Sequence, residues 1–364
     1  MTAPRPIRAA VSRAFGAPPA LEEVRLAPPG PGEVEVALAA TAICHSDISL
    51  IEGAWGGDLP AVFGHEAAGH VAALGPGTEA PAPGTPVIVT LIRSCGGCAF
   101  CAEGRAVRCT APRPGLKGPL TLADGAPLSQ GLACAAFAER VVVHRSQIAP
   151  LPAHIDMAAA SLLACGAITG LGAAINTARI RPGEAVVVIG AGGVGLNAIQ
   201  GARIAGAARI LAVDTQPAKL EAAVEFGATD VMQAGKAEPW RRARRLMGRA
   251  ADAVLVTVGS AGAYAEAPRY LAPGGRMVAV GMPPTGAEAA YEPVELAARG
   301  QVFLGSLMGD VVLARDIPWM LDLHAQGRLK LDELVSGRWR PDEIAAAIAD
   351  TRAGAARRNV ILWR

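Results

Sequence analysis

Residues 186–195 read VVVIGAGGVG, a run of apolar, mostly β-branched residues that leads into the spaced glycines Gly190, Gly192 and Gly195. The run predicts a buried strand, and the G-x-G-x-x-G spacing predicts a tight turn into a helix. The glycines let the backbone turn, approach a pyrophosphate and pack the helix on the strand, while free N–H groups at the helix start favour phosphate. We therefore expect a dinucleotide to contact Gly190, Gly192, Gly193, Val194 and Gly195.

A second apolar run, ILAV, ends in Asp214, nineteen residues after Gly195. An acidic side chain at this spacing accepts hydrogen bonds from the adenosine ribose hydroxyls. Its carboxylate would repel a 2′-phosphate, and no arginine follows it directly, so NAD is favoured over NADP. Glycines that serve only packing are the alternative, and the combination of strand, spacing and acid disfavours it.

Alternation of strands and helices begins near residue 155 and continues through residues 253–259 and 276–281. This βαβ pattern predicts a doubly wound parallel sheet. The preceding half differs, because strand-like segments at 33–42, 86–92 and 137–143 are separated by glycine- and proline-rich turns. The fold class we expect is α/β, with a Rossmann domain joined to a β-rich domain, and we find no internal repeat.

Composition limits the function classes. The chain has 364 residues, of which 51% are hydrophobic and 18% charged, with a net charge of +2. This length favours two domains or three, and the balanced charge favours neither nucleic acid nor an anionic membrane as partner. Residues 157–178 and 185–202 are apolar, but alanine and glycine dominate them, so we interpret both as buried core. The start lacks a signal-peptide core, and seven cysteines favour a cytoplasmic protein.

Four of these cysteines, Cys95, Cys98, Cys101 and Cys109, lie within fifteen residues. Four thiolates suit a closed tetrahedral zinc site that holds together a loop with little core. An iron–sulfur cluster is the main alternative, but ferredoxin spacing continues with three residues and a proline, whereas seven residues precede Cys109 and Thr110 follows it. Two disulfides are a further alternative, which a cytoplasmic location disfavours.

Three more residues suggest a second metal site, although their spacing alone does not bring them together. Cys44 follows a predicted strand, His65 comes twenty-one residues later, and Cys165 lies in an apolar helical segment. Each has an ordinary alternative, because a cysteine on an apolar helix is usually a small buried residue and a single histidine is usually a satisfied one.

In combination, four motifs resemble the zinc-dependent medium-chain alcohol dehydrogenase family. GHEAAGHV, CGGCAFC, CGAITG and VIGAGGVG occur in that family's order, and the resemblance extends from about residue 20 to the C-terminus. It implies a GroES-like catalytic domain over residues 1–167, an NAD-binding domain over 168–307 and a return to the catalytic domain over 308–364. The segment between Cys109 and Phe137 is similar to the larger, dimeric branch, which implies a homodimer.

The resemblance also implies two zinc ions per subunit. Cys44, His65 and Cys165 match the catalytic zinc ligands and leave one position for water or alcohol. Glu66 matches a carboxylate that approaches the zinc transiently while ligands exchange. The four-cysteine lobe matches the structural zinc site.

Proton transfer is implied for the residues after Cys44. Asp47 matches the acceptor that orients the ring of His65, and Ser46 matches the hydroxyl that takes the proton from the alcohol. The family's usual relay histidine is replaced by Ser49, so the first candidate route for the proton runs through Ser46, ribose hydroxyls and water. His45, at a position often occupied by an arginine that faces the pyrophosphate, is a second candidate for proton transfer as well as a cofactor contact.

Further positions are carried over from the family. Thr169, Lys219, Met282 and Arg358 fall at cofactor contacts. Met282 lies in residues 281–284, which match the loop on the nicotinamide side, and Arg358 matches a pyrophosphate contact. Alignment without gaps places Trp55 and Leu91 at substrate-pocket positions, with Phe137 nearby. The tryptophan favours an apolar or aromatic alcohol, and a tryptophan that only fills space is the alternative.

The expected function is reversible oxidation of a primary or secondary alcohol to an aldehyde or ketone by hydride transfer to NAD. Three alternatives stay open. The first keeps the fold and changes the substrate to a polyol or a thiol adduct of formaldehyde. The second is a zinc-free reductase of the same superfamily, which Cys44, His65 and Cys165 disfavour. The third is a non-catalytic zinc module.

Overall fold

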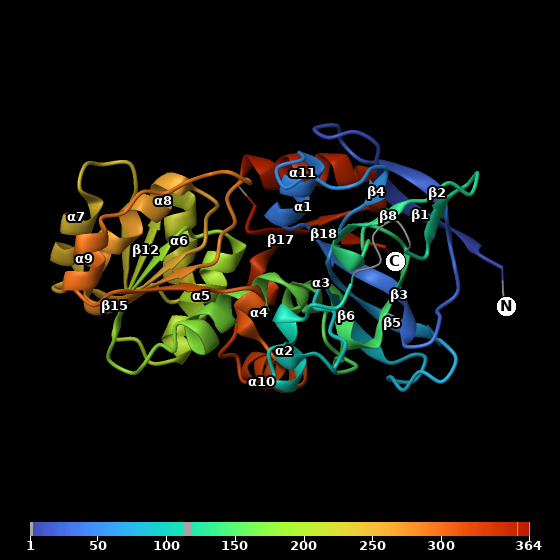
Figure 1. Cartoon of the computed structure of the whole chain (residues 1–364), viewed down its shortest axis with the longest axis horizontal. Coiled ribbons are helices and arrows are strands. Elements are labelled where there is room, and N and C mark those ends of the chain that lie inside the picture. The colour runs from blue at the N-terminus through green and yellow to red at the C-terminus, as the bar shows by residue number, and fades with distance from the viewer. Residues whose placement is uncertain (1–2, 113–117, 355, 364) are drawn as a thin grey trace. The chain divides into compact units, whose positions relative to one another are not determined.

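The structure is a computed structural model that describes residues 3–112, 118–354 and 356–363 (Figure 1). The chain forms two compact units. The first contains the residues up to Cys165, together with Val312–Ala325 and the chain from Lys330 onward. The second contains Gly166–Val311 and Gln326–Leu329. The first unit is therefore built from both ends of the chain.

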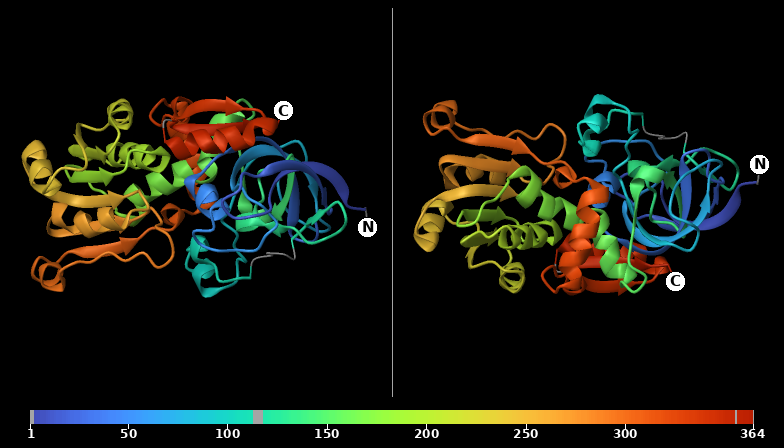
Figure 2. Two further views of the ribbon diagram at one scale, coloured as in Figure 1. Left: turned by 90° about the horizontal axis from the view of Figure 1, so that it is seen from above. Right: turned by 90° about the horizontal axis from the view of Figure 1, so that it is seen from below.

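The second unit is organised around a six-stranded parallel sheet (Figures 1 and 2). Its strand order, β13-β12-β11-β14-β15-β16, is that of a Rossmann fold and confirms the doubly wound sheet expected from the sequence. Every residue of β11 is buried, as expected for a strand covered on both faces. The strands are β11 (Ala185–Ile189), β12 (Arg209–Asp214), β13 (Asp230–Gln233), β14 (Ala251–Val256), β15 (Leu271–Ala279) and β16 (Val302–Gly305).

The helices of this unit connect the strands. The first of these helices, α4, packs closely on α5 at Gly170, where a Cβ atom would lie 2.4 Å from the carbonyl oxygen of Val194. The α-helices are α4 (Gly166–Gly172), α5 (Gly193–Ile204), α6 (Pro217–Glu225), α7 (Pro239–Met247), α8 (Ala261–Glu266) and α9 (Pro293–Ala298). A π-helical turn, η6 (Ala173–Thr177), extends α4, and the short helices η7 (Ala267–Tyr270) and η8 (Met308–Asp310) complete the unit.

The first unit is β-rich, as expected. One sheet has the order β7-β2-β1-β4-β8, and the other has the order β10-β6-β5-β3-β18-β17, with β9 also paired to β3. The C-terminal strand β18 pairs antiparallel with β3, which returns the end of the chain to this unit. The strands are β1 (Arg5–Ser12), β2 (Ala20–Leu26), β3 (Glu33–Ala42), β4 (Ala61–Val62), β5 (Glu66–Leu74), β6 (Pro86–Thr90), β7 (Leu120–Leu122), β8 (Ser129–Gln130), β9 (Arg140–His144), β10 (Ile148–Pro150), β17 (Val335–Trp339) and β18 (Arg358–Leu362).

Helices of the first unit are mostly short. The α-helices are α1 (His45–Ile51), α2 (Ala99–Ala102), α3 (Met157–Ser161), α10 (Leu313–Ala325) and α11 (Ile344–Ala353). The short helix η5 (Leu162–Ala164) follows α3 and leads to Cys165. No single helix in the described ranges is long and apolar enough to cross a membrane, while the bent pair Met157–Ala164 and Gly166–Thr177 meets the length and composition criterion.

Two strands differ from their predicted limits. The segment expected at 137–143 forms a strand only from Arg140, because Phe137 donates its N–H to Phe63 and accepts from Ala10 instead of continuing the β3 ladder. The segment expected at 86–92 ends at Thr90, where a turn begins in which Arg93 N–H donates to the Leu91 carbonyl.

Candidate functional site

Three potential metal ligands of the first unit converge at the ends of its elements. Cys44 follows β3 and precedes α1, His65 precedes β5, and Cys165 follows η5. One ligand atom from each lies within 4.8 Å of the others, and all three side chains are buried. The fold thus brings together residues that the sequence separates by more than a hundred positions.

His65 provides the test of whether this cluster fits a metal. Its Nε2 atom is buried and has no hydrogen-bond partner among the described residues. Burying a polar atom without a hydrogen-bond partner costs free energy. An imidazole nitrogen in this position beside two thiols is therefore placed to bind a metal ion. Two sulfurs and one imidazole nitrogen are the ligand set of a catalytic zinc site that keeps a fourth position open. The cluster therefore fits zinc.

Asp47 holds the imidazole from the opposite side. Its Oδ1 atom lies 2.8 Å from Nδ1 of His65 and also accepts the backbone N–H of Gly64 at 3.0 Å. Its Oδ2 atom accepts the N–H of Cys44 at 3.1 Å. One fully buried carboxylate thus orients two of the three ligands, and a hydrogen bond at Nδ1 leaves Nε2 free to bind metal.

The two buried thiols interact with each other. Donation from Cys165 lowers the pKa of the Cys44 thiol well below its usual range, even though burial opposes the charge. The same contact raises the pKa of Cys165. At least one sulfur is therefore disposed to be a thiolate, the form that binds metal.

Glu66 and Arg358 form a buried ion pair beside this centre. Glu66 begins β5 and is completely buried, and Arg358 begins β18 with its guanidinium against the Glu66 carboxylate. The negative charges of Glu66 and the nearby thiols outweigh burial and raise the pKa of Arg358. The Nε atom of Arg358 has no hydrogen-bond partner among the described residues. The carboxylate expected to approach the metal is thus held by the arginine expected to bind pyrophosphate.

The predicted proton-transfer residues lie on α1. Ser46 and Ser49 are half-buried, and His45 is exposed. Of the predicted pocket residues, Trp55 and Leu91 are half-buried. Phe137 is fully buried and packs on Gly64, the residue before the ligand His65.

The four-cysteine lobe forms a second cluster. The ligand atoms of Cys95, Cys98, Cys101 and Cys109 lie within 4.8 Å of one another. Backbone N–H groups point at the sulfurs, and those of Thr110 and Cys101 lower the pKa of Cys98 to about 6. Helix α2 in this lobe buries no residue, so apolar packing gives it little support. Four convergent thiols in a lobe without a core fit a structural zinc site.

Cys134, the seventh cysteine, lies outside both clusters. It is completely buried, and the Gln147 side-chain amide lies 3.5 Å from its sulfur. This placement agrees with a small core residue.

The dinucleotide fingerprint of the second unit adopts the geometry that its glycines predict. Gly190 has φ of +98°, and a Cβ on Gly195 would lie 1.9 Å from the Gly190 carbonyl oxygen. A Cβ on Gly192 would instead meet nothing within 4 Å. The first and third glycines are therefore required by the turn, while open space beside the second leaves room for a phosphate at the start of α5, which begins with Gly193 and Val194.

Asp214 ends β12 beside this turn. Its carboxylate accepts the N–H of Ala191 at 2.8 Å and that of Gln216 at 3.0 Å. Each carboxylate oxygen has a further lone pair, so the group retains the capacity to accept from a ribose hydroxyl.

The other predicted cofactor contacts of this unit lie on separate elements. Lys219 is half-buried on α6, and Met282 is 57% exposed after β15. Thr169 is buried on α4, where its hydroxyl donates to the Met308 sulfur at 3.7 Å.

Thr257 was not anticipated from the sequence. Its hydroxyl contacts the carbonyl oxygens of Ile189 and Gly190, at 3.0 and 2.9 Å, and thereby fixes the first glycine of the fingerprint. The available signal was a polar residue directly after the apolar run 251–256, at the carboxyl end of a strand that neighbours β11.

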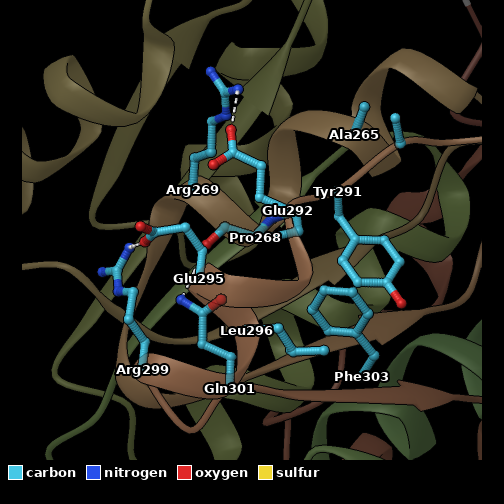
Figure 3. Close-up of a pocket in the computed structure, with 11 residues that line it drawn as sticks. Ala265, Pro268, Arg269, Tyr291, Glu292, Glu295, Leu296, Arg299, Gln301 and Phe303 are labelled. Atoms are coloured by element: carbon cyan, nitrogen blue, oxygen red, sulfur yellow. Dashed lines mark hydrogen bonds and ion pairs between the residues drawn. The ribbon is translucent and has the colours of Figure 1, made fainter.

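A cavity of about 220 Å³ in the second unit is lined by none of the predicted site residues (Figure 3). Its apolar side is formed by Tyr291 and Phe303, whose rings meet edge-on with centroids 5.4 Å apart. Its polar side carries Arg269 beside Glu292 and Arg299 beside Glu295.

Comparison with known proteins gives a family match in each half of the chain. Residues 30–153 match the alcohol dehydrogenase GroES-like domain, and residues 193–326 match the zinc-binding dehydrogenase domain. The chain is 34% identical to an S-(hydroxymethyl)glutathione dehydrogenase from Photobacterium damsela subsp. piscicida, covering 97% of this chain and 99% of the relative. A relative of the same name from Escherichia coli O1:K1 is also 34% identical, covering 98% and 99%.

Solved structures give the same result. An alcohol dehydrogenase zinc-binding domain protein from Burkholderia ambifaria superposes with a TM-score of 0.94 at 33% identity, covering 99% of each chain. Benzyl alcohol dehydrogenase from Acinetobacter calcoaceticus superposes with a TM-score of 0.92 at 28% identity, covering 98% of this chain and 99% of the other. The chain therefore belongs to the zinc-dependent medium-chain alcohol dehydrogenase family and is an NAD-dependent oxidoreductase that acts on CH–OH groups.

Proposed function

We propose that this enzyme oxidises a primary or secondary alcohol with an apolar or aromatic substituent to the aldehyde or ketone, reversibly. The observation that carries the alcohol chemistry is the buried cluster of Cys44, His65 and Cys165, with a histidine nitrogen for which the described part of the chain offers no hydrogen-bond partner. A zinc ion bound there supplies a Lewis acid that lets an alcohol ionise near neutral pH.

The surrounding residues have distinct tasks in this proposal. Asp47 keeps the His65 ring in the orientation and tautomer that metal binding requires. The Ser46 hydroxyl accepts the alcohol proton and passes it toward solvent through Ser49, water or the exposed His45. Arg358 neutralises Glu66 and would hold that carboxylate back from a metal bound by the three ligands.

Most of the cofactor-binding residues belong to the second unit, whereas Arg358 belongs to the first. The open space at Gly192 and the start of α5 receive the pyrophosphate, and Asp214 receives the adenosine ribose. We assign Thr169, Lys219, Met282 and Arg358 to further contacts with NAD.

Two observations support the proposed substrate class. Trp55 and Leu91, at the pocket positions, carry no charge and are half-buried. A relative of closely similar structure is named benzyl alcohol dehydrogenase. The second candidate is a thiol adduct of formaldehyde, which the name of the 34%-identical relatives supports.

Steady-state kinetics distinguishes the two candidate substrate classes. Reduction of NAD is followed by the absorbance of NADH, with benzyl alcohol as one substrate and formaldehyde with or without glutathione as the other. We expect a higher kcat/KM for benzyl alcohol and no requirement for thiol. Turnover that depends on glutathione would replace the first candidate with the second.

We further propose that the enzyme is a homodimer. Strand β16 lies at an edge of the parallel sheet, and large apolar side chains near it are exposed: Tyr291, Val294 and Val302, at 52%, 69% and 45%. An exposed apolar edge strand is a template for pairing with a second copy. Sedimentation velocity should give a dimer for the native chain and a monomer for Val302→Lys, and a monomeric native chain would refute the proposal.

A cytoplasmic location is also proposed. None of the seven cysteines, all of which lie in the described part of the chain, forms a disulfide, which is typical of a reducing compartment. Cell fractionation with antibody detection tests the assignment.

A further inference from the structure

Tyr264 of α8 makes a contact that reaches the loop after β15. Its hydroxyl donates a hydrogen bond to the carbonyl oxygen of Gly281, two residues beyond the end of that strand. Burial raises the pKa of Tyr264 to about 12, so the phenol keeps its proton throughout the pH range of ordinary assays. The Gly281 carbonyl is therefore permanently capped by a side chain.

The backbone of the same loop is fixed on its other side. The N–H groups of Val280 and Gly281 both donate to the carbonyl oxygen of Val256, at 3.0 and 2.9 Å. These two bonds tie the loop to the end of β14, while Tyr264 determines which way the Gly281 carbonyl points. Removing the phenol hydroxyl would release only this last constraint.

Close packing connects the loop to the dinucleotide turn. A Cβ on Gly281 would lie 2.4 Å from the backbone of Val258, and a Cβ on Gly259 would lie 2.4 Å from the carbonyl oxygen of Met282. A Cβ on Gly190 would in turn lie 2.4 Å from the Val258 side chain. Gly281 thus packs on the backbone of Val258, and the Val258 side chain packs on Gly190 of the fingerprint, so these positions are held without help from Tyr264.

This loop lies at the carboxyl edge of the sheet, where open α/β sheets bind their ligands. The Met282 side chain in it is 57% exposed, so the outer face of the loop is accessible to a ligand. Asp214 and Gly192 lie at the same edge and hold the other half of the cofactor in the function proposed above.

We propose that Tyr264 is a positioning residue for the nicotinamide half of NAD, acting through the Gly281 carbonyl and the loop at residues 281–284. The inference rests on the proposed assignment of NAD to this edge. It adds that the adenosine half of the cofactor is independent of Tyr264. Tyr264 itself touches neither the substrate nor the reacting atoms.

Comparing two ligands tests the inference. NAD contains the nicotinamide, whereas ADP-ribose contains the adenosine and pyrophosphate without it. Binding of each is measured by titration calorimetry to the native enzyme and to Tyr264→Phe. We expect the variant to bind NAD roughly three- to tenfold more weakly, the range of one net hydrogen bond, and to bind ADP-ribose unchanged.

Tyr270→Phe is the matched control. Tyr270 belongs to the same unit and is buried, whereas Tyr264 is half-buried. The Tyr270 hydroxyl has no hydrogen bond among the described residues. Its variant should bind both ligands as the native enzyme does. A deuterium isotope effect on kcat gives a second readout, and it should rise in Tyr264→Phe as the hydride-transfer step slows.

The outcomes separate the two proposals. If Tyr264→Phe bound NAD and ADP-ribose more weakly by the same factor, Tyr264 would have only a structural role and the inference would be overturned. Unchanged binding of both ligands with an unchanged isotope effect would also overturn it. A native enzyme that binds neither ligand would instead refute the assignment of NAD to this edge.

Discussion

The Nδ1 atom of His65 lies 2.8 Å from the Oδ1 atom of Asp47, and both side chains are completely shielded from solvent. An imidazole held by a carboxylate on one nitrogen and left without a partner on the other is prepared for a metal ligand. The same carboxylate receives the backbone N–H groups of Cys44 and Gly64. Asp47 therefore organises the metal centre although it is not expected to bind the metal.

Replacing Asp47 with asparagine should weaken the catalytic site without removing a ligand. The amide lacks the negative charge and presents an N–H group where two acceptor oxygens are now used. Loss of such a partner typically lowers metal affinity or activity about 10- to 100-fold. Zinc analysis after dialysis against a chelator and kcat/KM for alcohol oxidation measure the effect. Asp342→Asn, an exposed carboxylate on the same unit, is the control, and equal behaviour of the two variants would contradict the role of Asp47.

Cys98→Ser should remove the structural zinc and destabilise its lobe. Because α2 buries no residue, the metal is the main support of this segment. We expect the zinc content to fall from two to one per chain and the thermal unfolding midpoint to drop. Cys134→Ala, a buried cysteine outside both clusters, should keep both zinc ions. A Cys98 variant with two zinc ions and unchanged stability would exclude a structural site.

Asp214→Gly should relax the preference for NAD over NADP. Removing the carboxylate removes its repulsion of a 2′-phosphate and its hydrogen bonds to ribose. Since the carboxylate also accepts the N–H of Ala191, Asp214→Asn is the companion variant, which keeps an acceptor oxygen and loses the charge. The ratio of kcat/KM for the two cofactors should shift toward NADP in both variants. An unchanged ratio would mean that Asp214 does not bind the ribose.

Asp156 should make the stability of the first unit depend on pH. Its side chain accepts the N–H of Ala158 at the start of α3 and pairs with Arg338, and the Arg338 hydrogen bond lowers the pKa of the carboxyl. A carboxyl whose pKa is lower in the folded state stabilises the protein above its unfolded pKa of about 3.9, and this contribution is lost as the pH falls through the folded value.

Urea unfolding of Asp156→Asn measures this contribution. At neutral pH the variant should be less stable by roughly 0.2–1 kcal/mol, the range of a solvent-accessible ion pair, because asparagine still caps the helix and loses only the charge that pairs with Arg338. The difference from the native enzyme should shrink as the pH is lowered toward about 3. A destabilisation that does not change with pH would contradict an ionised Asp156.

Much of the fold could be predicted because its signals are local. The run 186–195 specifies a strand, a glycine turn and a helix start, and all three were found at those residues. Residues 33–42 alternate in polarity and form β3 over the same range. The four cysteines between Cys95 and Cys109 are close in sequence, so their convergence follows from their spacing.

Contacts between segments that lie far apart in the sequence could not be predicted from local sequence patterns. Glu66 and Arg358 are separated by almost 300 residues, and only the pairing of β18 with β3 brings the last strand to the metal centre. Thr257 contacts two backbone carbonyls and Tyr264 contacts one, so neither belongs to a repeating pattern. Phe137 was assigned to the pocket wall by alignment, while its full burial against Gly64 depends on three-dimensional packing.

The central claim is that Cys44, His65 and Cys165 hold the zinc at which alcohol is oxidised. Zinc content measured together with NADH formation, for the native enzyme and for His65→Ala, tests it most directly. We predict two zinc ions per chain and activity for the native enzyme, and one zinc ion, retained NAD binding and no turnover for the variant. A His65→Ala enzyme that keeps two zinc ions and oxidises alcohol would contradict the account.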